Sequence, residues 1–244
     1  MEVCDKNEVH NDFILSCINS ELDKLYQYTD MLTNKIIGSN DIVIRQIVDN
    51  DELYLLSEAR KNIYKKHASY FSQFYNDDYY IDEKDYSSFL FACYYQGDII
   101  GTQRIATHPF EVSKFIQHKD LCRFLGEDYQ QTYIEFSRLA VNSDLGLGKG
   151  VAHALNVVAG ILVSMSIKKS KYITYSKPKL KREAADFGSD VIAFTIKERE
   201  NEQYELYKSD ILMGLSKLLA IPKEPDLSLY DSIYNVMMNN KWSQ

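Results

Sequence analysis

The 244-residue chain has few of the residues that often mark special folds or sites, with one Trp, four Pro and ten Gly. It contains no low-complexity segment or internal repeat, and its apolar and charged fractions are typical of a globular protein. The four cysteines, Cys4, Cys17, Cys93 and Cys122, form no C-x-x-C pair, so neither a zinc knuckle nor a thioredoxin-type site is indicated. We therefore expect scattered reduced thiols and no metal site.

Long apolar runs and an excess of positive charge are also missing. The most apolar stretch, 151–167, is interrupted by His153, Asn156, Ser164 and Ser166 and falls short of a membrane span. The first residues lack the basic-then-apolar layout of a signal peptide. A formal net charge of −7 disfavours a general nucleic-acid binder. We expect a cytoplasmic protein whose partners include neither nucleic acid nor an integral membrane.

Tyr and Phe are abundant, with 19 and 11 copies, and the length suits one domain with a full apolar core. β-branched and alternating patterns predict strands at 42–48, 89–95, 99–106, 133–141, 171–176, 191–196 and 203–207. Helical periodicity predicts helices at 11–36, 50–67, 114–124, 151–168, 180–187, 212–219 and 227–239. Hairpins outnumber crossovers, which indicates a mixed α/β (α+β) fold with a mostly antiparallel sheet.

Three regions follow from these elements. Residues 1–40 form an N-terminal helical extension, 41–211 a central domain, and 212–244 a C-terminal helical extension. The N-terminal helix either packs against the central domain or binds a partner.

A glycine-rich turn separates the strand that ends at Val141 from the helix expected to begin near Val151. Gly146, Gly148 and Gly150 supply bare backbone, and amides at a helix N-terminus favour anions. The turn lacks both the dinucleotide fingerprint and the P-loop pattern. It is either a phosphate site or a purely structural turn.

The strand at 133–141 carries charge in an apolar setting. In a regular strand Glu135 and Ser137 share one face and Arg138 lies on the other. Burying such groups unpaired is costly. They form either a structural ion pair, with Arg104 as a candidate partner, or a general base beside an oriented cation in a cleft.

A third group of polar residues lies upstream. Asp82 and Asp85 are three residues apart and, with Arg60 and Tyr64, either line a charged recess or belong to a solvated acidic loop.

Together these pieces resemble a known family. The motifs, in chain order, are Arg60 with Tyr64, Tyr70, Asp82 with Asp85, Gly101-Thr102-Gln103-Arg104, and Glu135-Phe136-Ser137-Arg138. The chain resembles acyltransferases of the Gcn5-related N-acetyltransferase (GNAT) fold, in the branch of acyl-homoserine-lactone synthases and long-chain N-acyl amino acid synthases. The resemblance implies a GNAT-like acyltransferase domain at 41–211.

The resemblance also implies roles. Glu135 would be the general base, with Arg104 and Arg138 beside it as catalytic residues. The acceptor would be bound by Arg60, Tyr64, Asp82 and Asp85, and the thioester carbonyl would face the backbone near Leu139 and Val141. The donor's phosphopantetheine would lie on Gly148, Lys149, Gly150 and Ala152. No cofactor would be bound permanently, since the donor is the acyl-phosphopantetheine of acyl carrier protein, or acyl-CoA.

Two features of the chain bear on the donor. The family's phosphate turn begins with Arg or Gln, where this chain has Leu147. A basic block on an otherwise acidic chain comprises Lys168, Lys169, Lys171, Lys177, Lys179, Lys181 and Arg182. It is either a solvated surface or a docking surface for an acidic partner, for which acyl carrier protein is the candidate.

Four interpretations remain open. The first is transfer of a fatty acyl chain from acyl carrier protein to the amine of an amino acid or related small acceptor. The others are an acyl-homoserine-lactone synthase that uses S-adenosylmethionine, a plain acyl-CoA N-acetyltransferase, and a non-catalytic binding module. The last would be favoured by a Glu135 buried in a closed ion pair with no cleft beside it.

Overall fold

The computed structural model describes residues 20–67, 79–178, 191–199, 201–211 and 213. The strands are β1 (Ile42–Gln46), β2 (Phe89–Tyr95), β3 (Asp98–Ala106), β4 (Tyr133–Val141), β5 (Lys171–Ser176), β6 (Val191–Ile196) and β7 (Glu202–Asp210). The α-helices are α2 (Ser20–Ile37), α3 (Asn50–His67), α4 (His118–Leu125), α5 (Tyr129–Thr132) and α6 (Gly148–Ile167). Short 3-10 helices are η2 (Asp85–Ser87), η3 (Glu111–Lys114), η4 (Ser143–Leu145) and η7 (Lys197–Arg199).

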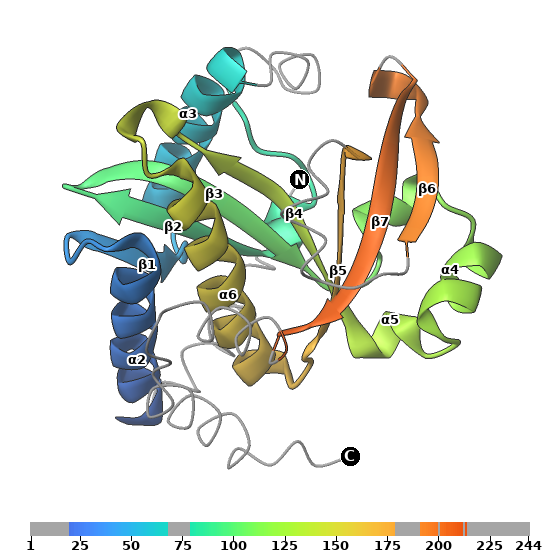
Figure 1. Cartoon of the computed structure of the whole chain (residues 1–244), viewed down its shortest axis with the longest axis horizontal. Coiled ribbons are helices and arrows are strands. Elements are labelled where there is room, and N and C mark those ends of the chain that lie inside the picture. The colour runs from blue at the N-terminus through green and yellow to red at the C-terminus, as the bar shows by residue number, and fades with distance from the viewer. Residues whose placement is uncertain (1–19, 68–78, 179–190, 200, 212, 214–244) are drawn as a thin grey trace, which may run out of the picture.

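The strands form one seven-stranded sheet in the order β1-β2-β3-β4-β5-β7-β6 (Figure 1). Every neighbouring pair is antiparallel except β4 and β5, which are parallel and joined through α6. A parallel pair needs such a crossover. The mixed, mostly antiparallel sheet predicted from the sequence is confirmed.

The parallel pair separates partway along its length. The ladder joins 133–136 of β4 to 171–174 of β5, yet β4 continues to Val141 and β5 to Ser176. Figure 1 shows the two strands diverging. We call the region past Phe136 and Thr174 the fork. Main-chain groups of β4 and β5 in the fork are not used in this ladder.

Helices cover both faces of the sheet, as the side chains of β2 show by packing alternately against α6 and α3. Phe91 belongs to the core cluster that includes α6, whereas Leu90 packs in the cluster that includes Leu56 of α3. Contrary to the expectation for 151–167, helix α6 is by length and composition apolar enough to cross a membrane, but 61% of the apolar window is buried inside the protein. Its composition is therefore explained by packing against the sheet.

The N-terminal helix packs against the central domain rather than standing free. Leu25 and Leu32 of α2 are buried in the cluster that contains α6 and β1. The end of α2 reaches the start of α6, where a Cβ on Gly150 would lie 3.5 Å from the Cα of Ile37. The helix predicted at 11–36 is confirmed from Ser20 onwards, and residues 1–19 lie outside the described residues.

Most predicted elements agree closely with the structure, and three differ. Helix α6 begins at Gly148 rather than near Val151. The helix predicted at 114–124 is replaced by η3 and then α4, because the chain turns at Phe115–Gln117 before α4 begins at His118. Strand β7 extends to Asp210, beyond the predicted 203–207, because its last three residues pair with β5. The helices predicted at 180–187 and in the C-terminal extension lie outside the described residues.

Candidate active site

A bulge in β4 turns Arg138 toward the same side as Ser137. Arg104 pairs with Ser137 and Thr102 with Ala140, so two residues of β4 oppose Gln103 of β3. Arg138 has φ +54°, and such an extra residue reverses the alternation of side chains. The prediction that Arg138 lies on the face opposite Glu135 and Ser137 is therefore wrong. Arg138 instead shares partners with Arg104, which itself donates from Nε to Ser137 Oγ at 3.0 Å.

The charged residues of the predicted motifs lie together. We define the arginine–carboxylate network as Arg60, Asp82, Asp85, Arg104, Glu111, Arg138 and Arg199. At its base, Asp85 accepts from Arg60 at 2.8 Å and from Arg104 at 3.3 Å, and all three side chains are fully buried. Buried charges persist only when they are paired, so these ion pairs are a condition for burying all three groups.

Asp82 joins two arginines at the edge of the network. Its carboxylate lies 2.6 Å from Arg104 Nη1 and 2.9 Å from Arg138 Nη2. Burial by itself would raise the pKa of Asp82, but the guanidiniums of Arg104 and Arg138 outweigh it and lower the pKa to about 2. The side chains of Asp82 and Arg138 keep 25% and 11% of their surface exposed, whereas Arg104 keeps none. Asp82 and Asp85 are thus paired with arginines and do not belong to a solvated acidic loop.

Glu111, which the sequence motifs did not indicate, lies at the centre of the network. Its carboxylate contacts Arg104 Nη2 at 2.5 Å, Arg138 Nη2 at 3.1 Å and Arg199 Nη2 at 3.8 Å. Arg199 was also missed; it lies on η7, in the β6–β7 connection. Glu111 therefore links both sides of the fork.

Glu135 is fully buried and accepts hydrogen bonds from two main-chain amides. Its two carboxylate oxygens accept from Glu111 N at 2.6 Å and from Val112 N at 2.8 Å. Burial raises the pKa of Glu135 and the Glu111 carboxylate raises it further, while the two amides and Arg104 oppose them, giving a pKa of about 7. The carboxyl group can therefore exchange a proton near neutral pH, but an acceptor cannot touch it directly in this conformation.

The remaining predicted acceptor residues lie beside the network. Tyr64 is buried against Tyr80 and Ala140, and burial raises the pKa of its hydroxyl. Leu139, next to the bulge, is 41% exposed in the fork. Val141 is paired with Gly101 of β3, so β4 is held on one side while its other edge faces the fork.

The glycine-rich turn differs from its prediction in one respect. Helix α6 begins at Gly148, three residues earlier than expected, so Gly148, Lys149 and Gly150 lie in its first turn and Ala152 in the next. The first helical hydrogen bond runs from Val151 N to Leu147 O, and the amides before it are those that a helix cannot pair internally. These amides form a candidate anion site.

The described residues of the basic block lie at two ends of one strand. Lys168, Lys169 and Lys171 lie between the end of α6 and the first residue of β5, whereas Lys177 follows the last residue of β5. Lys177 is also paired with Glu202 at 2.6 Å. Lys179, Lys181 and Arg182 lie outside the described residues. The part of the block nearest the fork is therefore the part that includes Lys177.

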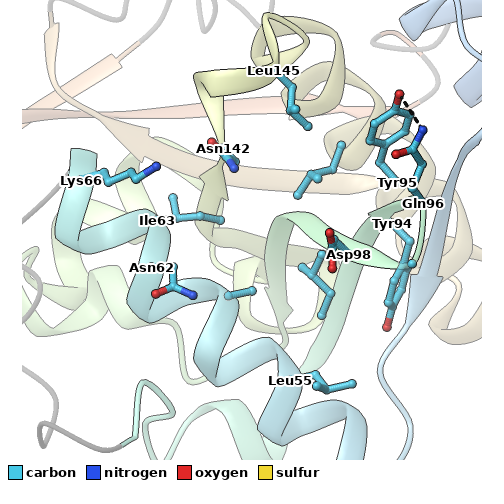
Figure 2. A pocket seen from close by; sticks show the side chains of 14 residues that line it. Leu55, Asn62, Ile63, Lys66, Tyr94, Tyr95, Gln96, Asp98, Asn142 and Leu145 are labelled. Carbon is cyan, nitrogen blue, oxygen red and sulfur yellow. Dashed lines mark hydrogen bonds between the residues drawn. The ribbon is translucent and has the colours of Figure 1, made fainter.

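A separate cavity of about 470 Å³ lies between α3, the β2–β3 hairpin and the end of β4. Figure 2 shows Ile63 and Lys66 of α3 on one side, Asn142 and Leu145 above them, and Asp98 of the hairpin opposite. No residue of the arginine–carboxylate network lines it. Within the described ranges no group of His, Cys, Asp and Glu is arranged to hold a metal ion, and Cys93 and Cys122 are free thiols.

Comparison with known proteins identifies the fold. No protein-family model matches the chain, and no curated protein matches it. Among solved structures, FeeM, an N-acyl amino acid synthase from uncultured soil microbes, is 17% identical with a TM-score of 0.50, and the match covers 70% of this chain and 90% of FeeM. The AHL synthase LasI is 18% identical with a TM-score of 0.51, with 70% and 90% covered.

The CoA-dependent acyl-homoserine lactone synthase BjaI is 16% identical with a TM-score of 0.52, and the match covers 76% of this chain and 83% of BjaI. Identities this low establish shape and not activity. The chain therefore has the GNAT-like fold of the N-acyl amino acid synthases and acyl-homoserine lactone synthases, as its motifs predict.

Proposed function

We propose that this protein is an N-acyltransferase that moves a fatty acyl chain from a thioester to the amine of an amino acid or a related small acceptor. The observation that supports this most directly is the meeting of Arg60, Asp82, Arg104 and Arg138, from separate motifs, in one network beside the fork. Neighbouring groups with strongly perturbed pKa values are typical of catalytic sites.

The acceptor binds at the edge of the network. Asp82 and Arg138 are the partly exposed members of their ion pair, so a substrate can reach them. An amino acid carries an ammonium and a carboxylate, which suit Asp82 and Arg138 respectively. Arg60, Arg104 and Asp85 are fully buried and hold the two edge residues in place.

The acyl thioester lies in the fork. Its carbonyl faces the β4 backbone from Leu139 to Val141, whose amides stabilise the oxyanion that forms during attack. The acceptor nitrogen forms a bond to the carbonyl carbon, the carbon–sulfur bond breaks, and the departing sulfur takes up the proton that the attacking nitrogen loses, so a thiol leaves. Before attack the ammonium gives up a proton to Glu135. The proton passes through a water, because both Glu135 oxygens already accept hydrogen bonds from main-chain amides.

The donor is an acyl carrier protein. Leu147 replaces the cationic or amide residue expected at the start of the phosphate turn, and the end of α2 lies against Gly150, so Lys149 is the one cation that the first turn of α6 adds to its amides for a CoA pyrophosphate. Carrier docking uses Lys177 together with Lys179, Lys181 and Arg182. Lys168, Lys169 and Lys171 follow the C-terminal end of α6 and lie at the other end of β5 from Lys177.

The second candidate is an acyl-homoserine-lactone synthase with S-adenosylmethionine as acceptor. LasI and BjaI match as well as FeeM does, and BjaI is described as CoA-dependent, so acyl-CoA is the alternative donor. A non-catalytic module is less well supported, because Glu135 accepts hydrogen bonds from main-chain amides and does not form a closed ion pair.

Mass spectrometry of lipid extracts from cells that express the protein tests the proposal. We expect a new N-acyl species whose mass identifies both the chain and the acceptor. An acyl-homoserine lactone would support the second candidate instead. Extracts identical to those of cells expressing Arg138→Gln would contradict acyl transfer in both forms.

A further inference from the structure

Glu111 contacts the site through two different groups. Its main-chain amide donates to Glu135 at 2.6 Å, and its carboxylate accepts from Arg104 at 2.5 Å and contacts Arg138 at 3.1 Å. The side chain is 6% exposed. We propose that Glu111 is the positioning residue of this site, fixing Glu135 through its amide and the two arginines through its carboxylate. This inference rests on the proposed function, although its first test needs no substrate.

The order of the chain makes this double contact possible. Glu111 is the first residue of η3, and the amides of Glu111 and Val112 at the start of a 3-10 helix have no partner within it. The Glu135 carboxylate takes both amides. The backbone of η3 is therefore held by β4, which fixes where the Glu111 side chain points.

The charges around Glu135 come from several elements. Glu111 faces it from η3, Arg104 from β3, Lys84 from the turn before η2, and Tyr175 from β5. Among these, Glu111 is the acid that opposes ionisation of Glu135 together with burial. Removing its charge leaves Arg104 to favour the Glu135 carboxylate, so the pKa of Glu135 must fall.

Arg199 extends this arrangement across the fork. It lies on η7, its guanidinium carbon is 5.9 Å from the Tyr175 ring centre and 5.3 Å from the Tyr204 ring centre, and it contacts Glu111 at 3.8 Å. Tyr175 lies past the last residue of β5 that pairs with β4, and it pairs with Leu206 of β7. The position of Glu111 therefore depends on both sides of the fork, and so does its effect on Glu135.

The test is a ¹³C NMR titration of glutamate carboxyl groups in the full chain, with the Glu135 signal assigned by its loss in Glu135→Gln. In Glu111→Gln the main-chain amide remains and only the charge is removed, so we expect the pKa of Glu135 to fall by about one unit. Glu58→Gln is the matched control, because Glu58 pairs with Lys61 on α3 and should leave the Glu135 titration unchanged. A folded Glu111→Gln protein with an unchanged Glu135 titration would overturn the proposal.

A second variant is needed in case Glu111→Gln fails to fold, because that substitution leaves arginine charge uncompensated. Glu111→Asp keeps the charge on a shorter side chain, so the Glu135 pKa should stay within about half a unit of the original value while contact with Arg138 weakens. In the transfer assay it should therefore raise the acceptor KM more than it lowers kcat. A large fall of the Glu135 pKa in Glu111→Asp would contradict the charge effect. A wild-type protein that titrates as expected but transfers no acyl group would refute the proposed function alone.

Discussion

The two sides of the fork differ in the chemistry they present. The β1–β4 side contributes Arg60, Arg104 and Arg138, each of which forms an ion pair with Asp82, Asp85 or Glu111. The β5–β7 side contributes Tyr175, Phe194 and Tyr204, and Phe115 from the β3–β4 connection packs against them; we call these four residues the aromatic cluster. The rings of Phe115 and Phe194 are stacked with centres 6.1 Å apart.

The difference suggests a division of labour between the two sides. Charged groups suit a polar acceptor, and an aromatic wall suits an acyl chain. Arg199 is the residue that touches both, since it lies by Tyr175 and Tyr204 and contacts Glu111. Substitutions on the two sides should therefore differ in what they damage.

The largest effect on stability is expected for Arg104→Met. Arg104 is fully buried and contacts Ser137, Asp82, Asp85 and Glu111. Its loss removes one cation from each of three carboxylates and should cost about 3–5 kcal/mol of unfolding free energy. Urea unfolding measures this. A cost below about 1 kcal/mol would mean that the network does not hold this side together.

Next is Glu135→Gln, which we expect to reduce acyl transfer by about 10²–10⁴-fold because the proton acceptor is lost. The new amide also turns an NH₂ group toward a main-chain N–H, which should cost about 1–3 kcal/mol. Steady-state kinetics on the folded variant measure the first effect. Turnover within a factor of two of wild type would remove Glu135 from the chemistry.

Glu135 also predicts how stability depends on pH. Its pKa is raised from 4.5 to about 7 in the folded protein, so the folded state binds the proton more tightly than the unfolded chain does. Stability from this group is full below pH 4.5 and falls by about 3 kcal/mol as pH rises to 7. Unfolding titrations of wild type and Glu135→Gln should show this slope in the wild type alone; equal slopes would contradict the raised pKa.

A smaller effect is expected on donor use. Lys177→Ala should reduce transfer from acyl carrier protein about 3–10-fold and leave transfer from a small acyl thioester unchanged. The matched control is Lys168→Ala, which removes the same charge before the start of β5, whereas Lys177 follows the end of β5. Equal losses in both variants, or equal losses with both donors, would contradict docking near Lys177.

The contrast between the two sides also explains what the sequence could predict. Strand β4 and helix α3 have the predicted bounds because their apolar periodicity is clear. The network residues of the β1–β4 side belong to spaced motifs, so Arg60, Asp82 and Asp85 could be named before the structure was known.

Other features depend on tertiary context. Glu111 lies in a short 3-10 turn and Arg199 in a hairpin connection, where no periodicity marks a residue as buried. The bulge at Arg138 requires a positive φ at an arginine, which local preference does not indicate. The separation of Lys168 from Lys177 follows from the path of β5, which charge counting along the chain cannot show.

The most direct measurement is a reaction of the purified protein with acyl carrier protein loaded with a fatty acyl chain and a mixture of ¹⁵N-labelled amino acids, read by mass spectrometry. The account predicts an amide that contains both the acyl chain and ¹⁵N. Its rate of formation should fall by about 10²–10⁴-fold in Glu135→Gln. Release of free fatty acid without any labelled amide, from either the carrier protein or acyl-CoA, would contradict it.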